Sequence, residues 1–366
     1  MRFTCIRSYL YDAVAAVERV VEKSTALPIL QNVLLKTEKG RVLIAGTNLE
    51  IGVRAYCQAK IDEEGEITLP AKTLMQFLTH LQGEKVVVKT TAATGATIEA
   101  ENASLELKTL DAKDFPIIPE LSEALQVTAP TKDLHTALGS LVFFAASGEV
   151  RPELGGVFCA FDGEMVRVAA TDSFRLGEYI FSLPKKTNTF SCIIPTRTVN
   201  EFLRIFSNGE NVDISANTNQ ILFKQADREL ISRLIEGKYP DYTAVIPTTF
   251  ATRAYINREL FIQALRAASA CSGKNKEVKI TLVPQKNKLH IESRNSDVGE
   301  YVGEIPCEGK GGDLAVTCNY QYFLDALGKL ESEMVSLEGN KETDPLLLKN
   351  INAIKLRYVI MPLRSY

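Results

Sequence analysis

Tryptophan is absent from this chain of 366 residues, and histidine occurs only three times. His80, His135 and His290 lie far apart and form no HExxH or similar close spacing, so no zinc site is expected. The seven cysteines are an odd number and contain no CxxC pair. They are expected to be buried free thiols rather than disulfides or metal ligands. The sequence therefore predicts neither a metal nor a cofactor.

Long apolar runs are also missing. No stretch approaches the roughly 20 apolar residues of a membrane span, and no apolar segment follows Met1–Thr4 as in a signal peptide. We expect a cytoplasmic globular protein with room for two or three domains. The net charge of −3 gives no overall attraction to nucleic acid, but it permits a basic surface on one side.

Motifs for catalysis are not found. The sequence has no P-loop, no GxGxxG after a strand and no GxSxG elbow. The acidic run Asp62-Glu63-Glu64 adjoins Gly65, a pattern typical of a solvated turn rather than of a glycosidase pair. The prediction is a non-enzyme; an enzyme with a carboxylate pair in an unrecognised cleft is kept as an alternative.

One sequence pattern recurs about every 120–125 residues, at Pro70–Leu78, Pro195–Leu203 and Val316–Leu324. Each copy follows an apolar run, opens an amphipathic helix and itself ends in Phe-Leu. A period of this length is that of a domain rather than of a solenoid repeat.

Other features recur in the same order. Earlier helical patterns lie at 8–21, 131–145 and 257–270, and the last two begin with N-cap residues followed by an acid. Turn sequences that join two strands lie at 47–52, 171–177 and 295–299, and strands end at Phe115-Pro116, Tyr239-Pro240 and Met361-Pro362. The fold class predicted is α+β, with three tandem similar domains at 1–125, 126–250 and 251–366, each two helices packed on antiparallel sheets.

The last ten residues, Arg357–Tyr366, include Tyr358, Val359, Ile360, Met361 and Leu363. Exposed, such a segment would favour aggregation, so we expect it to be docked. Because Pro362 cannot donate to a strand ladder, the tail is expected at a sheet edge or pocket rim, where it forms one side of a hydrophobic groove.

Three tandem α+β units that end in this tail closely resemble the bacterial DNA polymerase III β subunit, the sliding-clamp family. The motifs that carry the resemblance are Leu27–Leu30, Gly46–Glu50, Ala170–Asp172 with Arg175-Leu176, Gly237–Tyr242 and the tail. The resemblance spans the whole chain. It implies a non-catalytic processivity factor, a head-to-tail homodimeric ring that encircles double-stranded DNA without reading its sequence.

The resemblance also implies a peptide-binding pocket for the replicative polymerase, the clamp loader, other polymerases and repair proteins. Its matching residues are Leu154, Thr171, Ser173, Phe174, Arg175, Leu176, Pro240, Ala244, Val245, Leu346, Leu348, Val359, Ile360, Met361, Pro362, Leu363 and Arg364. Ser173-Phe174, Ala244 and Leu348 depart from the family pattern, which predicts a more apolar pocket. For Leu176 and Val245, ordinary core packing is the alternative.

Two further surfaces follow from the resemblance. The DNA-binding candidates are Lys23, Lys72, Arg151, Arg197 and Arg204, and the dimer-interface candidates are Leu105, Leu107, Ala270 and Cys271. Acidic residues share the presumed DNA-facing helices, so a solvated helix face is the alternative for each basic residue. A peptide-docking hub that acts away from DNA is the alternative function.

Overall fold

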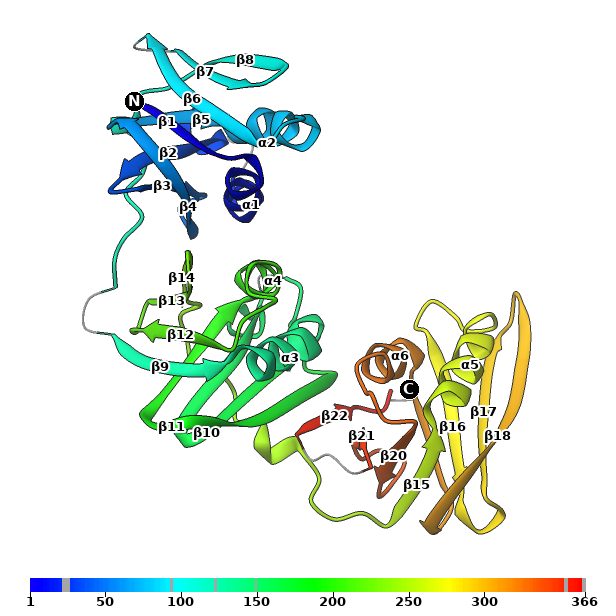
Figure 1. Cartoon of the computed structure of the whole chain (residues 1–366). Coiled ribbons are helices and arrows are strands. Elements are labelled where there is room, and N and C mark those ends of the chain that lie inside the picture. The colour runs from blue at the N-terminus through cyan, green and yellow to red at the C-terminus, as the bar shows by residue number, and fades with distance from the viewer. Residues whose placement is uncertain (22–26, 93–94, 122–123, 149, 352–354, 364–366) are drawn as a thin grey trace. The chain divides into compact units, whose positions relative to one another are not determined.

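The computed structural model describes residues 1–21, 27–92, 95–121, 124–148, 150–351 and 355–363. In these residues six α-helices alternate with antiparallel strands (Figure 1). The helices are α1 (Arg7–Glu18), α2 (Ala71–His80), α3 (Thr131–Leu141), α4 (Thr196–Ile205), α5 (Arg258–Ser269) and α6 (Tyr320–Leu327). Two helices fall in each predicted repeat, so the α+β prediction is confirmed.

The first compact unit comprises residues 1–135, 184–188 and 197–234. Its twelve-stranded sheet has a central path β8-β7-β6-β1-β4-β14-β13-β12-β9, and β2, β3 and β5 pair off that path. The strands are β1 (Arg2–Ile6), β2 (Asn32–Glu38), β3 (Arg41–Thr47), β4 (Ile51–Glu63), β5 (Glu66–Pro70), β6 (Lys85–Ala92), β7 (Gly95–Ala100), β8 (Ala103–Lys108), β9 (Leu125–Pro130), β12 (Asn211–Ala216), β13 (Gln220–Gln225) and β14 (Arg228–Arg233).

The second compact unit comprises residues 136–183, 189–196 and 235–366. Its ten-stranded sheet has the order β10-β11-β22-β21-β20-β15-β18-β17-β16-β19. The strands are β10 (Gly156–Thr171), β11 (Arg175–Pro195), β15 (Thr252–Asn257), β16 (Glu277–Val283), β17 (Lys288–Asn295), β18 (Gly299–Gly311), β19 (Leu314–Asn319), β20 (Met334–Gly339), β21 (Leu346–Asn350) and β22 (Leu356–Ile360).

The three sequence repeats fold into two compact units, and in each unit one strand pairing joins two neighbouring repeats. In the first unit β14 pairs with β4, where Ser232 is opposite Ile51. In the second unit β22 pairs with β11, where Val359 is opposite Leu176. Each sheet therefore continues from one repeat into the next, and the middle repeat contributes to both units.

The helices form where the repeat patterns predict them, with small shifts at their ends. In α5 the side chain of Asn257 accepts the N–H of Leu260 at 3.1 Å, which confirms the predicted N-cap. Helix α1 is shorter than the predicted 8–21 range, and α3 ends at Leu141 and continues as the 3₁₀ turn η3 (Val142–Phe144). The predicted free thiols are confirmed: all seven cysteines are free, and all except Cys271 are buried.

Helix burial follows the amphipathic pattern. In α4 the side chains of Val199, Phe202 and Ile205 are buried, whereas Arg197 and Asn200 are exposed. Across the described ranges, the helices all fall short of the length and apolarity needed to cross a bilayer.

Candidate functional site

The β10–β11 hairpin turns at Thr171–Arg175 and is fixed by its own side chains. The hydroxyl of Thr171 donates to the Arg175 carbonyl at 2.7 Å and accepts the N–H of Ser173 at 3.1 Å. One Asp172 carboxylate oxygen accepts the N–H groups of Phe174 at 2.9 Å and Arg175 at 3.0 Å. Ser173 has φ +78°, in the left-handed region that favours glycine. A rigid turn therefore projects side chains beside the C-terminal strand.

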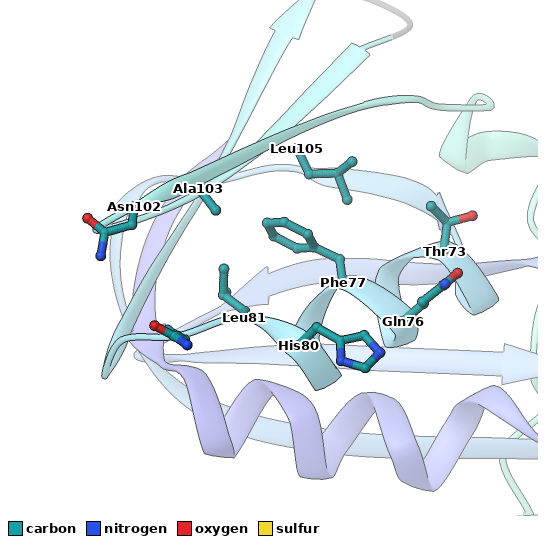
Figure 2. Close-up of a pocket in the computed structure, with 9 residues that line it drawn as sticks. Thr73, Gln76, Phe77, His80, Leu81, Asn102, Ala103 and Leu105 are labelled. Atoms are coloured by element: carbon teal, nitrogen blue, oxygen red, sulfur yellow. The ribbon is translucent and has the colours of Figure 1, made fainter.

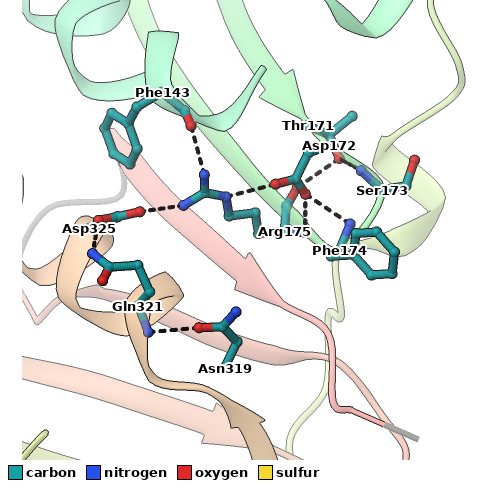
Figure 3. A network of polar contacts seen from close by, with 9 residues as sticks. All are labelled: Phe143, Thr171, Asp172, Ser173, Phe174, Arg175, Asn319, Gln321 and Asp325. Atoms are coloured by element: carbon teal, nitrogen blue, oxygen red, sulfur yellow. Dashed lines mark hydrogen bonds and ion pairs between the residues drawn. The ribbon is translucent and has the colours of Figure 1, made fainter. Parts of the chain in front are cut away.

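The guanidinium of Arg175 links the hairpin to the third repeat (Figure 3). It donates to Asp172 at 2.9 Å, to Asp325 on α6 at 2.5 Å and to the carbonyl of Phe143 at 2.8 Å. It also lies over the ring of Tyr322, 4.8 Å from the centroid. The side chain is 13% exposed. Two aspartates thus neutralise the charge of Arg175 within the chain, so a partner's carboxylate is not needed to balance it.

The tail is docked as predicted over its described part. Strand β22 pairs with both β11 and β21, and Tyr358, Val359 and Ile360 are buried. Beyond the strand, the N–H of Met361 donates to the Phe174 carbonyl at 2.9 Å, and that of Leu363 donates to the Thr317 carbonyl at 2.8 Å. Backbone hydrogen bonds thus fix the segment that forms one wall of the pocket.

A pocket of about 240 Å³ lies between this hairpin, the tail and the turn η5 (Thr243–Val245). Its lining residues are Arg151, Leu154, Thr171, Ser173, Arg175, Leu176, Pro240, Asp241, Tyr242, Val245, Val359 and Met361. Leu154, Leu176, Tyr242 and Val359 belong to one buried hydrophobic cluster that supports the floor. The pocket has an apolar floor and a polar rim, the usual construction of a site for apolar anchor side chains.

A buried polar contact holds the floor in place. The hydroxyl of Tyr242 donates to Glu178 at 3.0 Å, and Glu178 also accepts from Arg357 at 2.5 Å. Burial, together with the adjacent Glu178 carboxylate, raises the pKa of Tyr242 well above its usual range. Tyr242 is therefore neutral at physiological pH and acts as a hydrogen-bond donor.

The structure brings together nine of the predicted pocket residues: Leu154, Thr171, Ser173, Arg175, Leu176, Pro240, Val245, Val359 and Met361. Phe174 and Ala244 are exposed and Pro362 and Leu363 are half-buried, but none of these four lines the cavity. Arg364 lies outside the described residues. Val245 is 42% exposed, so ordinary core packing does not explain it, whereas Leu176 is buried and serves both the core and the pocket floor.

Leu346, Leu348 and Ile360 do not line this cavity, and their part in peptide binding stays a prediction. Strand residues alternate between the two faces of a sheet, and Val359 packs in the cluster beneath the pocket. Its cross-strand partner on β21 is Leu347, whereas Leu346 pairs with Ile360 on the opposite face. Leu347 belongs to the buried cluster beneath the pocket and does not line the cavity either. Asp241 and Tyr242 line the pocket but were not predicted to, although both lie in the Gly237–Tyr242 motif.

A second, larger cavity of about 520 Å³ lies in the first unit between α2 and the β7–β8 hairpin (Figure 2). It is lined by Thr73, Gln76, Phe77, His80, Leu81, Gln82, Asn102, Ala103 and Leu105. The ring of Phe77 and the methyl groups of Leu81 and Leu105 point into it. Strand β8 is the end strand of its sheet, so this apolar cavity adjoins a free strand edge.

Three family models cover most of the sequence. They describe the N-terminal, central and C-terminal domains of the DNA polymerase III beta subunit and match residues 1–119, 128–241 and 243–364. The chain belongs to the DNA polymerase III beta subunit family.

Similar proteins agree over the full length. The beta sliding clamp of Synechocystis is 28% identical over 391 aligned residues, which cover all of this chain and 99% of that protein. Solved structures of the sliding clamps of Pseudomonas aeruginosa and Bacillus subtilis are 27% and 28% identical, with TM-scores of 0.95 and 0.94 and complete coverage of both chains. The chain is thus a DNA polymerase III processivity clamp with the three-domain clamp fold, and the family is non-catalytic.

The basic residues expected to meet DNA in a clamp differ in their surroundings. Lys72 on α2 and Arg197 on α4 are exposed, and Lys23 lies outside the described residues. Arg151 lines the pocket and forms an ion pair with Glu153 at 3.1 Å. Arg204 is 22% exposed and donates to Glu201 and to two backbone carbonyls. The structure therefore gives Arg204 partners other than DNA, which sequence spacing could not reveal.

The residues expected at a clamp's dimer interface divide between the units. Leu105 lines the second cavity, and Leu107 on the same strand is buried. Ala270 and Cys271 follow the last residue of α5, where Ala270 is exposed and Cys271 is half-buried. A clamp that closes head to tail needs such a pair of unlike surfaces.

Proposed function

We propose that this clamp acts as a homodimeric ring around duplex DNA and tethers polymerases, the clamp loader and repair proteins through the pocket beside β22. The observation that carries the proposal is the apolar pocket built on the docked tail, because a docked tail gives a preformed site for a short peptide. Tethering raises the effective concentration of the polymerase at the template, which is the physical basis of processivity.

The partner segment proposed for this pocket is a short peptide with apolar anchors. The cavity of about 240 Å³ holds a few side chains, and its floor of Leu154, Leu176 and Val359 supplies desolvation rather than charge. The guanidinium of Arg175 is already neutralised, so affinity comes mainly from apolar burial and from backbone contacts at the rim.

The pocket is tested with a fluorescent peptide of the form Gln-Leu-x-Leu-Phe, with binding followed by anisotropy. Val245→Asp places a carboxylate on the pocket wall and should weaken binding at least tenfold. Val298→Asp is the matched control, because Val298 is 66% exposed and does not line the pocket. A variant lacking residues 361–366 should also lose the peptide. Equal affinity for all four proteins would refute the assigned site.

The proposed dimer contact joins unlike ends of two chains. The cavity at Phe77 and Leu105 receives Ala270 and Cys271 of the second copy, and the free edge of β8 meets β18. Strand β18 pairs with β15 through residues 307–311. Its earlier part is the segment that corresponds in the repeats to β4 at Gly52 and β11 at Leu176, where the internal pairings form.

Sedimentation tests this contact. The parent protein should have twice the 40.4 kDa mass of one chain, and Leu105→Glu should shift it to the monomer because a carboxylate enters an apolar cavity. Leu49→Glu is the matched control, since Leu49 is 53% exposed on another loop. A monomeric parent protein would refute the ring.

For DNA we propose phosphate contacts by Lys72 and Arg197, with Lys23 and Arg151 as further candidates and Arg204 set aside. Contacts of this kind are salt-sensitive and independent of sequence. Changing Lys72 or Arg197 to Glu should reduce the salt dependence of DNA binding by about one counterion each, whereas Lys341→Glu should not. If all variants bind DNA alike but keep their peptide partners, the chain acts as a hub away from DNA.

The proposal also covers the domain boundaries and the cellular location. The domain boundaries are proposed at 125/126 and 250/251. The first lies between the segments matched by the N-terminal and central family models, which end at 119 and begin at 128, whereas the second lies shortly after the start of the C-terminal match at 243. A cytoplasmic location is proposed because replication of the chromosome takes place there. Fractionation of cells with an antibody against the chain checks the location.

A further inference from the structure

The second helix of each repeat offers one position for comparison. The repeated Phe-Leu pair is Phe77-Leu78 in α2, Phe202-Leu203 in α4 and Phe323-Leu324 in α6. The residues directly after these pairs are Thr79, Arg204 and Asp325. The second and third of these form charged contacts with the preceding repeat, and Thr79 does not have a charged side chain.

Arg204 joins the second repeat to the first. It donates to the carbonyls of Ala15 at 2.7 Å and Ala16 at 2.6 Å, both in the last turn of α1. Carbonyls in a helix's last turn have no partner within the helix and lie at the negative end of its dipole. Glu201, one turn earlier on α4, holds the same guanidinium at 2.6 Å. Arg204 therefore caps a helix of the neighbouring repeat.

Asp325 joins the third repeat to the second with the charges reversed. It accepts from Arg175, which also donates to the carbonyl of Phe143 in the turn that follows α3. Gln321, one turn earlier on α6, holds the other oxygen of Asp325 at 2.7 Å. The same helix position thus ties the end of the preceding repeat's first helix at both internal junctions.

The matching position on α2 is different. Thr79 is exposed, and its hydroxyl donates to the Met75 carbonyl in its own helix at 2.8 Å. Gln76 stands where α4 has Glu201, and it is exposed beside the cavity of Figure 2. On α5, the ninth and tenth residues, Arg266 and Ala267, correspond to Ala15 and Ala16 of α1, and both are exposed.

We infer that Thr79 is a positioning residue that keeps the junction between two chains easier to open than the junctions within a chain. The inference rests on the proposed homodimeric ring. At each internal junction a charged side chain fastens the helix end, whereas Thr79 on α2 has no charge and is hydrogen-bonded within its own helix. The residue at this repeated position then contributes to how easily the junction between the chains opens.

The first test installs the missing contact. The double variant Gln76→Glu with Thr79→Arg reproduces the Glu201–Arg204 pair on α2. Exchange of fluorescently labelled subunits between dimers should slow about tenfold, since charge-assisted hydrogen bonds to the α5 carbonyls are gained. The carbonyls of Arg266 and Ala267 already accept the Ser269 hydroxyl at 2.7 Å and the Ala270 N–H at 3.2 Å, and each keeps a second lone pair for the guanidinium. Gln76→Glu with Thr79→Lys is the matched control of equal charge, and one ammonium cannot reproduce the fork of a guanidinium, so its effect should be smaller.

The second test removes a fastening and does not depend on α2 tolerating arginine. Arg204→Thr copies Thr79 onto α4. Hydrogen exchange should then speed up at the internal β4–β14 pairing, at Ile51–Ala55 and Arg228–Ser232, while subunit exchange stays at the parental rate. Arg204→Lys should restore part of the protection.

The outcomes distinguish a failure of the proposed ring from a failure of the role given to Thr79. A parent protein that sediments as a monomer refutes the proposed ring. If the parent is a dimer, either of two results would refute only the role of position 79. The first is that the double variant Gln76→Glu with Thr79→Arg exchanges subunits at the parental rate. The second is that Arg204→Thr leaves hydrogen exchange at the β4–β14 pairing unchanged. Slower subunit exchange in the first test and faster local exchange in the second support it.

Discussion

Replacing Arg175 by alanine tests how strongly one side chain fixes both the pocket and the junction behind it. The substitution removes hydrogen bonds to Asp172, Asp325 and the Phe143 carbonyl. It leaves two aspartates, 18% and 27% exposed, on either side of the space that the cation occupied. Breaking a fully buried pair costs about 3–5 kcal/mol. Because water reaches both carboxylates, we expect the lower end, about 3 kcal/mol.

The assay is urea unfolding followed by circular dichroism, with peptide anisotropy on the same samples. The Arg175→Ala protein should unfold at lower urea and bind the peptide more weakly, because the hairpin that carries Thr171 and Ser173 loses its anchor. Arg175→Lys should recover only part of the stability, since one ammonium cannot reach three acceptors in the geometry of a guanidinium.

Arg294→Ala is the matched control, because Arg294 is an exposed arginine in the same unit. A loss below about 1 kcal/mol for Arg175→Ala, the range of surface ion pairs, would refute the structural role given to this network. Normal peptide affinity despite a large loss of stability would refute only its role in shaping the pocket.

Two further predictions concern close packing and pH. Gly177→Ala should destabilise the chain by about 1–3 kcal/mol, because a Cβ would overlap the Leu141 side chain, whereas Gly273→Ala, with open space around it, should be neutral in thermal unfolding. Burial alone would raise the pKa of Glu229, but the hydrogen bonds and charges of Lys224 and Arg54 together outweigh it and hold the pKa below 4.5. Since a lowered carboxyl pKa stabilises the fold above the unfolded pKa, the urea midpoint of the parent should exceed that of Glu229→Gln at pH 7. That difference should shrink as the pH falls below about 4.5, and a constant difference down to pH 3 would contradict the assignment.

Much of the fold was predictable because its signals are local and repeated. The Phe-Leu helices, the capped start of α5 and the polar turn at Thr171–Gly177 each appear as a short pattern with one structural solution. Three copies in the same order made each pattern more reliable. The grouping into two compact units was not predictable, because it depends on β4–β14 and β11–β22 pairings between distant strands.

The site was predictable only in part, for a related reason. Nine of the residues that the resemblance implies line one cavity, but side-chain direction depends on strand register, which places Leu347 rather than Leu346 or Leu348 in the cluster beneath it. The contacts of Arg175 and Arg204 within the chain were not predictable, because sequence does not show which carbonyls and carboxylates surround a side chain. Basic residues near the end of a helix are as suited to fastening as to ligand binding.

A repeated backbone does not by itself make a binding site, as the first repeat shows. Its hairpin at Thr47–Ile51 copies the one at Thr171–Arg175: Thr47 donates to the Ile51 carbonyl at 2.9 Å, and Asn48 accepts the N–H of Ile51 at 2.7 Å. Yet the cavity beside it is about 80 Å³, against about 240 Å³ beside the second hairpin.

The difference lies in the side chains that fill the space. A Cβ at Gly52 of the first hairpin would lie 2.8 Å from Ile118 and 3.0 Å from Ile231, so two isoleucines already occupy that corner. At the second hairpin the residue matching Ile118 is Tyr242, whose hydroxyl donates a hydrogen bond to Glu178 at 3.0 Å. This hydrogen bond keeps the ring at the floor of the pocket. The volume for a peptide is thus set by which repeat carries a tethered tyrosine and which carries isoleucines, on the same backbone frame.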